Sequence, residues 1–308
     1  MINKMTHEEF VEKHKNHSFW NKVVENILRL ENIHYQSFSR FPMGGNIVYE
    51  VDDQLVLKLF APFDSMEFFI ETDVLEKTDW SKVEIQVPRI LRKGNFDGWH
   101  FFLMSRVPGE LLIDVWQVMS KYERIALASD LGKLIKQMHQ LDVSIYKNLD
   151  RSFDEWIMRQ KEQVHRHHEK TGLSAILVNE VTNYVSTFKP TGESVLLTGE
   201  YTPFNLMVSQ VDGQWTLTGL IDFADCFIGE STYDLLGPIL FNYYKEENLT
   251  RAFFEGYGLE LNGELRIRLM QLLLLHRFSH LPYYMEGEIE INEVESLNSL
   301  SNSFFSFD

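Results

Sequence analysis

The spacing of apolar residues changes near position 33, and the change predicts two kinds of structure in the first part of the chain. Up to about Ile33 apolar residues recur at helical intervals, so this segment is predicted to be helical. The residues that carry this pattern are Phe19, Trp20, Val23, Val24, Ile27 and Leu28. Residues 35–60 instead form short alternating runs, separated by Met43-Gly44-Gly45-Asn46 and by Asp52-Asp53, which indicates consecutive antiparallel strands.

One of these predicted strands, residues 55–60, carries a lysine among apolar side chains. Alternation places Lys58 on one face with Val56 and Phe60, so a buried Lys58 needs an anion. An edge-strand lysine that reaches water is the alternative. Residues 64–78 are predicted to form the next helix, in which Glu71 interrupts an apolar stripe. We therefore expect Glu71 to pair with Lys58, with Glu67, one turn earlier, as the competing partner.

A break at Val107-Pro108-Gly109 separates this region from a mostly helical remainder. The run from residue 99 to 104 before it is strand-like, whereas residues 126–141 carry apolar positions at helical spacing. We predict an N-terminal domain of residues 1–107 and a helical C-terminal domain of residues 108–308. His139 is interpreted as a core or helix-end residue. The run His165–His168 is interpreted as a solvated helix face, because no Cys or acidic partner gives metal-ligand spacing.

A hairpin is predicted around Asp212-Gly213, which lies between two strand-like runs, residues 205–211 and 214–222. With a two-residue turn, the register places Asn205 and Asp222 on the same side at the open end of the hairpin. Glu200, in the loop before it, can reach the same place. Three oxygen-bearing groups then converge, and such hard ligands suit Mg²⁺ bound to a phosphate. The alternative is that these groups only cap turns.

Composition narrows the classes of function. The chain has 308 residues, 44% of them hydrophobic, which is enough for a sizeable core. Its 29 basic and 45 acidic residues give a formal net charge of −16, which disfavours nucleic acid and anionic membranes as partners. A cationic small molecule would be favoured, although solubility alone also explains the charge. The single cysteine, Cys226, and the lack of a long apolar run predict a cytoplasmic protein.

Residues 195–235 resemble the catalytic core of the aminoglycoside phosphotransferase family, whose fold is that of protein kinases. The family's His-Gly-Asp loop, with an asparagine five positions after the aspartate, matches Thr198-Gly199-Glu200 and Asn205. Its metal-binding aspartate matches Asp222. Its later glycine and Tyr-Asp-Leu pattern match Gly229 and Tyr233-Asp234-Leu235.

Upstream residues resemble the nucleotide site of the same family. Lys58 fits the strand lysine that holds the nucleotide phosphates, and Glu71 fits its helix partner. The loop over the phosphates matches Gly44, Gly45 and Asn46, and the hinge that meets the adenine matches Met104, Ser105 and Val107. The resemblance extends over nearly the whole chain. It implies an α+β, two-lobed, protein-kinase-like fold with a small antiparallel-sheet N-lobe and a larger, mainly helical C-lobe.

The resemblance also implies a function, that of a small-molecule kinase. Such an enzyme transfers the γ-phosphate of ATP or GTP to a hydroxyl of an aminoglycoside-like or other small acceptor, bound in the helical lobe. In that mechanism Lys58 holds the α- and β-phosphates, Asn205 and Asp222 hold Mg²⁺, and Glu200 accepts the proton of the acceptor hydroxyl.

The chain departs from the family at two positions, Thr198 and Glu200. Glutamate keeps the base strength of aspartate, but its extra methylene moves the carboxylate by roughly 1 Å, an error that can cost about a hundredfold in rate. The alternatives are a nucleotide-binding, catalytically weak regulatory relative and a binding protein that no longer uses nucleotide. The identity of the acceptor and the oligomeric state stay open. The acidic run Met285–Glu290 permits a cationic acceptor but is also typical of solvated surface.

Overall fold

The computed structural model describes residues 2, 4–149, 152–241, 243, 246–276, 279–284 and 296–305. The chain divides into two compact units. The first unit comprises Met1–Thr78, Gln86–Pro108 and Gly219–Asp225, and the second comprises Asp79–Ile85, Gly109–Thr218 and Cys226–Asp308. The acidic run at 285–290 lies outside the described residues.

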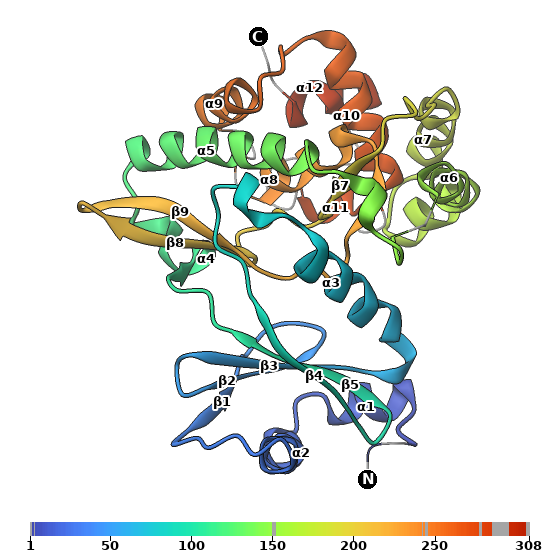
Figure 1. Ribbon diagram of the computed structural model, residues 1–308. Coiled ribbons are helices and arrows are strands. Elements are labelled where there is room, and N and C mark those ends of the chain that lie inside the picture. The colour runs from blue at the N-terminus through green and yellow to red at the C-terminus, as the bar shows by residue number, and fades with distance from the viewer. Residues whose placement is uncertain are drawn as a thin grey trace. The chain divides into compact units, whose positions relative to one another are not determined.

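The first unit is built on a five-stranded sheet in the order β1-β2-β3-β5-β4 (Figure 1). The strands are β1 (Phe38–Arg40), β2 (Ile47–Val51), β3 (Leu55–Phe60), β4 (Ile90–Phe96) and β5 (Trp99–Ser105), and every neighbouring pair is antiparallel. The central strand β3 carries Lys58, which lies opposite Val48 on β2 and Phe102 on β5. The predicted antiparallel strands are therefore present, and Lys58 is on an inner strand rather than at an edge.

Helices of the first unit are α1 (His7–Lys13), α2 (His17–Leu30) and α3 (Ser65–Lys77), with a 3₁₀ turn η1 (Pro62–Asp64) before α3. The predicted N-terminal helix is thus two helices, because Asn16 caps the start of α2 by accepting from the backbone N–H of Phe19. Trp20 on α2 is fully buried and packs against Trp99 on β5 with ring centroids 5.3 Å apart. Aromatic packing of this kind joins the two helices to the sheet.

The second unit is mainly helical. Its helices are η2 (Trp80–Lys82), α4 (Leu112–Val115), η3 (Trp116–Val118), α5 (Lys121–His139), η4 (Val143–Ile145), α6 (Phe153–Lys170), α7 (Ala175–Ser186), η5 (Ser231–Leu235), α8 (Leu236–Phe241), α9 (Glu247–Tyr257), α10 (Gly263–Leu275), α11 (Leu281–Tyr284) and α12 (Leu297–Phe304). α5 covers most of the helix predicted at 126–141. It begins earlier, because Ser120 and Glu123 form a capping box, and it ends at His139. α5 and α9 approach closely: a Cβ on Gly132 would overlap the carbonyl oxygen of Phe253.

Short strands precede and follow the loop of residues 198–205. β7 (Val195–Leu197) pairs with β10 (Phe227–Gly229), and β6 (Glu110–Leu111), β8 (Leu206–Val211) and β9 (Gln214–Leu220) form a three-stranded sheet. Asp212 and Gly213 link β8 to β9 with φ angles of 51° and 78°, the left-handed pair of a tight hairpin turn. The predicted hairpin is confirmed.

One interpretation from the sequence is wrong. His168 on α6 is fully buried, and its Nε2 lies 2.9 Å from the carbonyl oxygen of Leu274 near the end of α10. His167 likewise lies 2.6 Å from the carbonyl oxygen of Ser279. Carbonyl groups in the last turn of a helix have no partner within that helix. The contact of the buried His168 with the Leu274 carbonyl supplies such a partner and stabilises the fold, which a histidine on a solvated face would not do. His165 is exposed, as expected.

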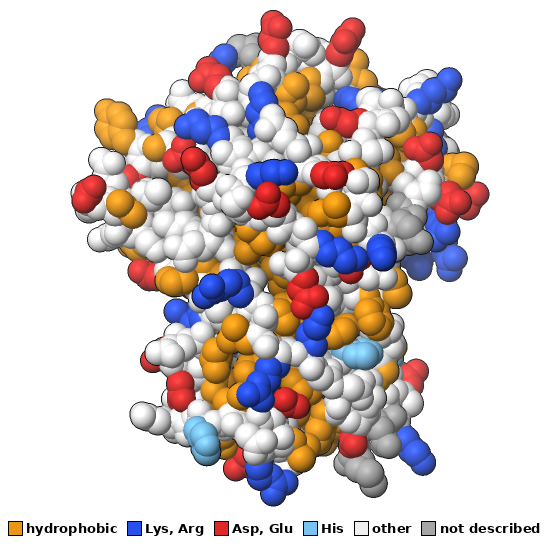
Figure 2. Space-filling model, in the orientation of Figure 1, with side chains coloured by type: hydrophobic (Ala, Val, Ile, Leu, Met, Phe, Trp, Pro, Cys, Tyr) orange, Lys and Arg blue, Asp and Glu red, His pale blue; other side chains and the backbone are white. Residues whose placement is uncertain are grey.

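Acidic and basic side chains are interspersed over the face shown in Figure 2, so the net negative charge does not gather in one patch there. Within the described residues, no helix combines the length and apolar character needed to cross a membrane.

Candidate functional site

Lys58 lies between two carboxylates within the first unit. Its Nζ is 2.7 Å from Glu71 Oε2 and 2.9 Å from Asp222 Oδ1. Lys58 and Glu71 are almost wholly buried, whereas the side chain of Asp222 is 42% exposed. Of the two glutamates weighed as partners, Glu71 is therefore the one in contact. Glu67 instead accepts a hydrogen bond from Asn46.

One ammonium faces two carboxyl groups in this cluster, and burial raises the pKa of Glu71 although Lys58 opposes that rise. Burial by itself lowers the pKa of Lys58, but Asp222 and Glu71 together outweigh it and raise the pKa above its usual value. Partial burial tends to raise the pKa of Asp222, yet Lys58 holds it below the ordinary range. The lysine is thus an ammonium and Asp222 a carboxylate at neutral pH. These are the charge states needed to hold a phosphate and a metal ion.

The backbone at Asp222 is unusual. Asp222 adopts a φ of 66°, in the left-handed region that few residues other than glycine, asparagine and aspartate visit. Two hydrogen bonds support it: the Ala224 N–H donates to Asp222 Oδ1 at 3.3 Å, and the Phe223 N–H donates to Glu71 Oε1 at 3.3 Å. Glu71 therefore binds the lysine with one oxygen and the segment after Asp222 with the other.

The loop predicted to cover the phosphates is Gly44-Gly45-Asn46, between β1 and β2. Gly44 has a φ of 115°, which only glycine adopts without strain. Asn46 Nδ2 donates to Glu67 Oε2 at 2.9 Å, and burial raises the pKa of Glu67. Glu67, the alternative partner considered for Lys58, thus bonds a residue of this loop instead of the lysine.

The residues predicted to contact adenine lie at the end of β5, where Met104 and Ser105 are its last two residues, and just after it, at Val107. Met104 and Val107 are buried, and Ser105 bonds Arg89 twice: the Ser105 N–H donates to the Arg89 carbonyl, and the Arg89 N–H donates to Ser105 Oγ, both at 2.9 Å. The Arg106 N–H donates to the carbonyl of Gln54 at 2.8 Å. This segment is fixed in place by its neighbours, and contact with adenine stays a prediction.

In the second unit, Glu200 and Asn205 contact each other. Asn205 is 8% exposed, and its Nδ2 donates to both the backbone carbonyl and the Oε2 of Glu200, each at 3.2 Å. The amide nitrogen is thereby used, so Oδ1 is the atom that Asn205 can offer to a cation. An amide oxygen is one of the hard oxygen ligands that suit Mg²⁺.

No group of three or more His, Cys, Asp or Glu side chains suited to a metal occurs in the part of the chain that the structure describes.

The loop at 198–200 is held by Asp234, a residue known from the sequence only as part of a motif. Asp234 Oδ2 accepts from the Thr198 N–H at 3.0 Å, and Oδ1 accepts from the Gly199 N–H at 2.8 Å. Gly199 has a φ of 72°, which glycine tolerates. His139 Nε2 lies 3.2 Å from Asp234 Oδ2, and His139 Nδ1 lies 2.8 Å from the hydroxyl of Tyr257. His139 is a buried helix-end residue, as expected, and it also supports Asp234.

Comparison with known proteins identifies the family of this chain. The model of the phosphotransferase enzyme family matches residues 40–269. The chain belongs to this family. The match confirms the resemblance found in the motifs, and with it the predicted class of enzyme, a phosphotransferase with an alcohol group as acceptor.

Solved structures agree on the fold. The chain is similar to aminoglycoside 2′-phosphotransferase-IIIa in its GDP complex, at 18% identity over 94% of this chain and 99% of that chain, with a TM-score of 0.68. It is similar to APH(2″)-IIa in a ternary complex with streptomycin and ATP, at 18% identity over 90% and 97% of the chains, with a TM-score of 0.61. A third is the aminoglycoside phosphotransferase APH(3″)-Id from Streptomyces rimosus, at 16% identity over 82% and 97%, with a TM-score of 0.61. Identities this low show the fold alone, which is the predicted kinase-like α+β fold.

Proposed function

We propose that this phosphotransferase is a small-molecule kinase that transfers the γ-phosphate of ATP or GTP to a hydroxyl group. The observation that carries the proposal is Lys58, a buried ammonium held at 2.7 Å by Glu71 and at 2.9 Å by the half-exposed Asp222. A buried, fixed cation next to an exposed carboxylate is what a polyphosphate and its metal ion need. Similar folds have been solved with GDP or ATP, which supports a nucleotide as the donor.

Lys58 would hold the α- and β-phosphates. Glu71 keeps its ammonium in one position, because the two groups are buried together and the lysine has little room for another rotamer. Catalysis of phosphoryl transfer depends mainly on such positioning and on electrostatic stabilisation, since charge spreads over the oxygens of the moving group.

Mg²⁺ would be held by Asp222 and by Oδ1 of Asn205. When bound, the ion supplies charge neutralisation for the phosphates. The proposal is supported by the contacts of Lys58, whose ammonium already faces the carboxyl groups of Glu71 and Asp222, so a bound polyphosphate would need a further cation.

Glu200 would accept the proton, or a hydrogen bond, from the acceptor hydroxyl. Its carboxylate is oriented by the amide of Asn205, and its backbone follows two residues whose N–H groups bond Asp234.

An aminoglycoside-like acceptor is proposed first. One similar fold was solved with streptomycin, and the net charge of −16 favours a cationic partner. Amino alcohols and sugars are the other hydroxyl acceptors to test. A cytoplasmic location is part of the proposal, because a single cysteine suits a reducing compartment.

The second candidate function is a nucleotide-binding relative with weak catalysis. It is favoured by the contact of Glu200 Oε2 with Asn205. The glutamate side chain, longer than the aspartate of the family, turns toward the amide of a residue that is proposed to serve only the metal site. Both candidates predict nucleotide binding, but only the kinase predicts efficient transfer of phosphate to an acceptor.

The test is calorimetric titration with ATP and with GTP, each with Mg²⁺ and again with the metal chelated. Metal-dependent binding that is lost in Lys58→Ala and in Asp222→Asn is expected. Turnover with a panel of hydroxyl acceptors then distinguishes the kinase from the weak relative. Unchanged nucleotide binding in both variants, or no binding by the wild type, would refute the site.

A further inference from the structure

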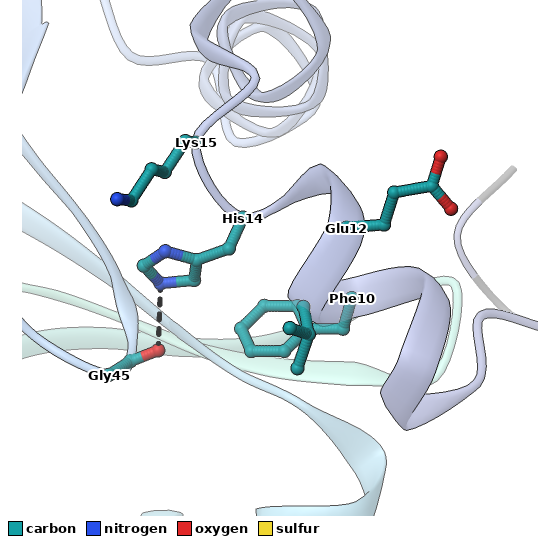
Figure 3. A pocket seen from close by; sticks show the side chains of 6 residues that line it. Phe10, Glu12, His14, Lys15 and Gly45 are labelled. Carbon is teal, nitrogen blue, oxygen red and sulfur yellow. Dashed lines mark hydrogen bonds between the residues drawn. The ribbon is translucent and has the colours of Figure 1, made fainter.

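The N-terminal segment of the chain contacts the predicted nucleotide loop. Residues 1–39 precede the part that matches the family, which begins at residue 40. His14, which follows α1, has its Nε2 3.1 Å from the carbonyl oxygen of Gly45 (Figure 3). The ring also forms part of the wall of a pocket of about 360 Å³ lined by Phe10, Lys15 and Gly45 among others.

The position of His14 is fixed by the residues around it. Phe10, one turn earlier, is buried against Trp20 and Trp99, with ring centroids 6.0 and 5.7 Å away. The indole of Trp20 donates to the carbonyl of Lys13 at 3.0 Å, and Arg40 Nη1 donates to the carbonyl of His14. The backbone on both sides of the imidazole is therefore anchored to the body of the first unit.

The tautomer of the imidazole decides whether Nε2 donates to Gly45. Its Nε2 faces two groups, the Gly45 carbonyl, which only accepts, and Arg40 Nη2 at 3.3 Å, which only donates. In a neutral ring Nε2 is either a donor, which suits the Gly45 carbonyl, or an acceptor, which suits Arg40. Burial and the neighbouring Arg40 hold the pKa of His14 below its usual value, so the ring is neutral at pH 7. Because Arg40 already bonds the His14 carbonyl, we assign the proton to Nε2 and the hydrogen bond to Gly45.

The next residue of the loop is held from another element. Asn46 Nδ2 donates to Glu67 on α3 at 2.9 Å, so consecutive residues of the loop are tied to the end of α1 and to α3. A Cβ on Gly45 would meet no atom within 4 Å, so packing does not explain the glycine. A backbone that a ligand must approach closely does explain it.

We propose that His14 is a positioning residue of the nucleotide site, whose Nε2–H bond to the Gly45 carbonyl fixes the 44–46 loop in the conformation that receives a nucleoside triphosphate. The inference rests on the proposed nucleotide site. A loop that is ordered before binding does not pay the entropy of ordering at that moment, so the brace favours nucleotide affinity and not the chemical step.

Three variants test this role. His14→Phe keeps a ring of similar shape and loses the donor, while His14→Gln keeps an amide N–H at a reach similar to that of Nε2. His17→Phe is the matched control, because His17 is exposed at the start of α2. We expect His14→Phe to weaken Mg·ATP binding about three- to tenfold, the range for one hydrogen bond, with kcat within about twofold. His14→Gln and His17→Phe should bind as the wild type does.

A structural role alone would lower the melting temperature and affect kcat as much as the nucleotide KM. Wild-type affinity in His14→Phe, or an equal loss in His14→Gln, would overturn the proposal. Hydrogen exchange of the Gly45 and Asn46 amides separates it from the proposed function, since this readout needs no nucleotide. If the wild type binds no nucleotide, the proposed function fails. If these amides then exchange faster in His14→Phe than in the wild type and the other variants, the role of His14 in fixing the loop is supported. Equal exchange rates in all of them would refute that role.

Discussion

Glu71→Gln is expected to destabilise the protein strongly, because both oxygens of Glu71 accept hydrogen bonds in a fully buried place. Oε2 binds Lys58 at 2.7 Å and Oε1 binds the Phe223 N–H at 3.3 Å. Glutamine keeps the shape but has one acceptor oxygen, so its NH₂ must face either the ammonium or the amide. A hydrogen bond to a charged group is worth about 1.5–3 kcal/mol, and an unmet buried donor costs about 1–3 kcal/mol.

The two losses overlap, and Asp222 still pairs with Lys58, so the expected decrease in the free energy of unfolding is about 2–4 kcal/mol. Urea denaturation measured by fluorescence gives the value. Glu67→Gln is the matched control, with the same chemical change four residues earlier on α3. Glu67 is half-buried and accepts one neutral hydrogen bond, from the partly buried Asn46, so its loss should stay below about 1 kcal/mol. Equal midpoints for the two variants would refute the reasoning.

Three further outcomes are expected. Glu200→Gln should lower kcat by about a hundredfold or more while the Kd for Mg·ATP stays within about twofold, and equal losses in both would contradict a base; a higher kcat in Glu200→Asp would show that the longer side chain is misplaced. Asp234→Asn leaves one acceptor for two backbone N–H groups, so kcat should fall at least about tenfold with little change in nucleotide Kd, and unchanged kcat would exclude a role in positioning the loop. Burial lowers the pKa of His168 to about 4, so the unfolded chain binds a proton that the folded chain does not between about pH 6.5 and 4; stability should fall with falling pH in this window by about 3 kcal/mol in total, His168→Gln should flatten the dependence, and the exposed His165→Gln should leave it unchanged.

Local patterns predicted the elements around the site well. Alternation in β3 placed Lys58 on a buried face, and the Asp212-Gly213 dipeptide marked the hairpin, because both signals depend on neighbouring residues alone. The choice between Glu71 and Glu67 was harder. Both lie on α3 one turn apart, and only the rotation of α3 against the sheet decides which carboxylate reaches the lysine.

Contacts to backbone carbonyls were beyond the sequence. His14 bonds Gly45 and His168 bonds Leu274, and in each case the acceptor is a main-chain oxygen distant along the chain. Such an oxygen leaves no trace in residue type, whereas a charged partner does. A carboxylate in an apolar run, as in Tyr233-Asp234-Leu235, does give a signal. Burying it costs free energy unless it accepts hydrogen bonds, so its position predicts donors nearby.

The exposure of the two carboxylates decides which bond of Lys58 a phosphate can replace. Glu71 has no exposed side-chain surface, and separating a wholly buried pair leaves an uncompensated charge that costs several kcal/mol, about 3–5 in other proteins. Asp222 is 42% exposed, so its contact with Lys58 is screened by water and is weak by comparison. In the proposed site, an incoming phosphate would therefore exchange with Asp222 while Glu71 stays in place. The released Asp222 carboxylate would then be available to a cation, so the proposal predicts that metal binding and nucleotide binding are linked.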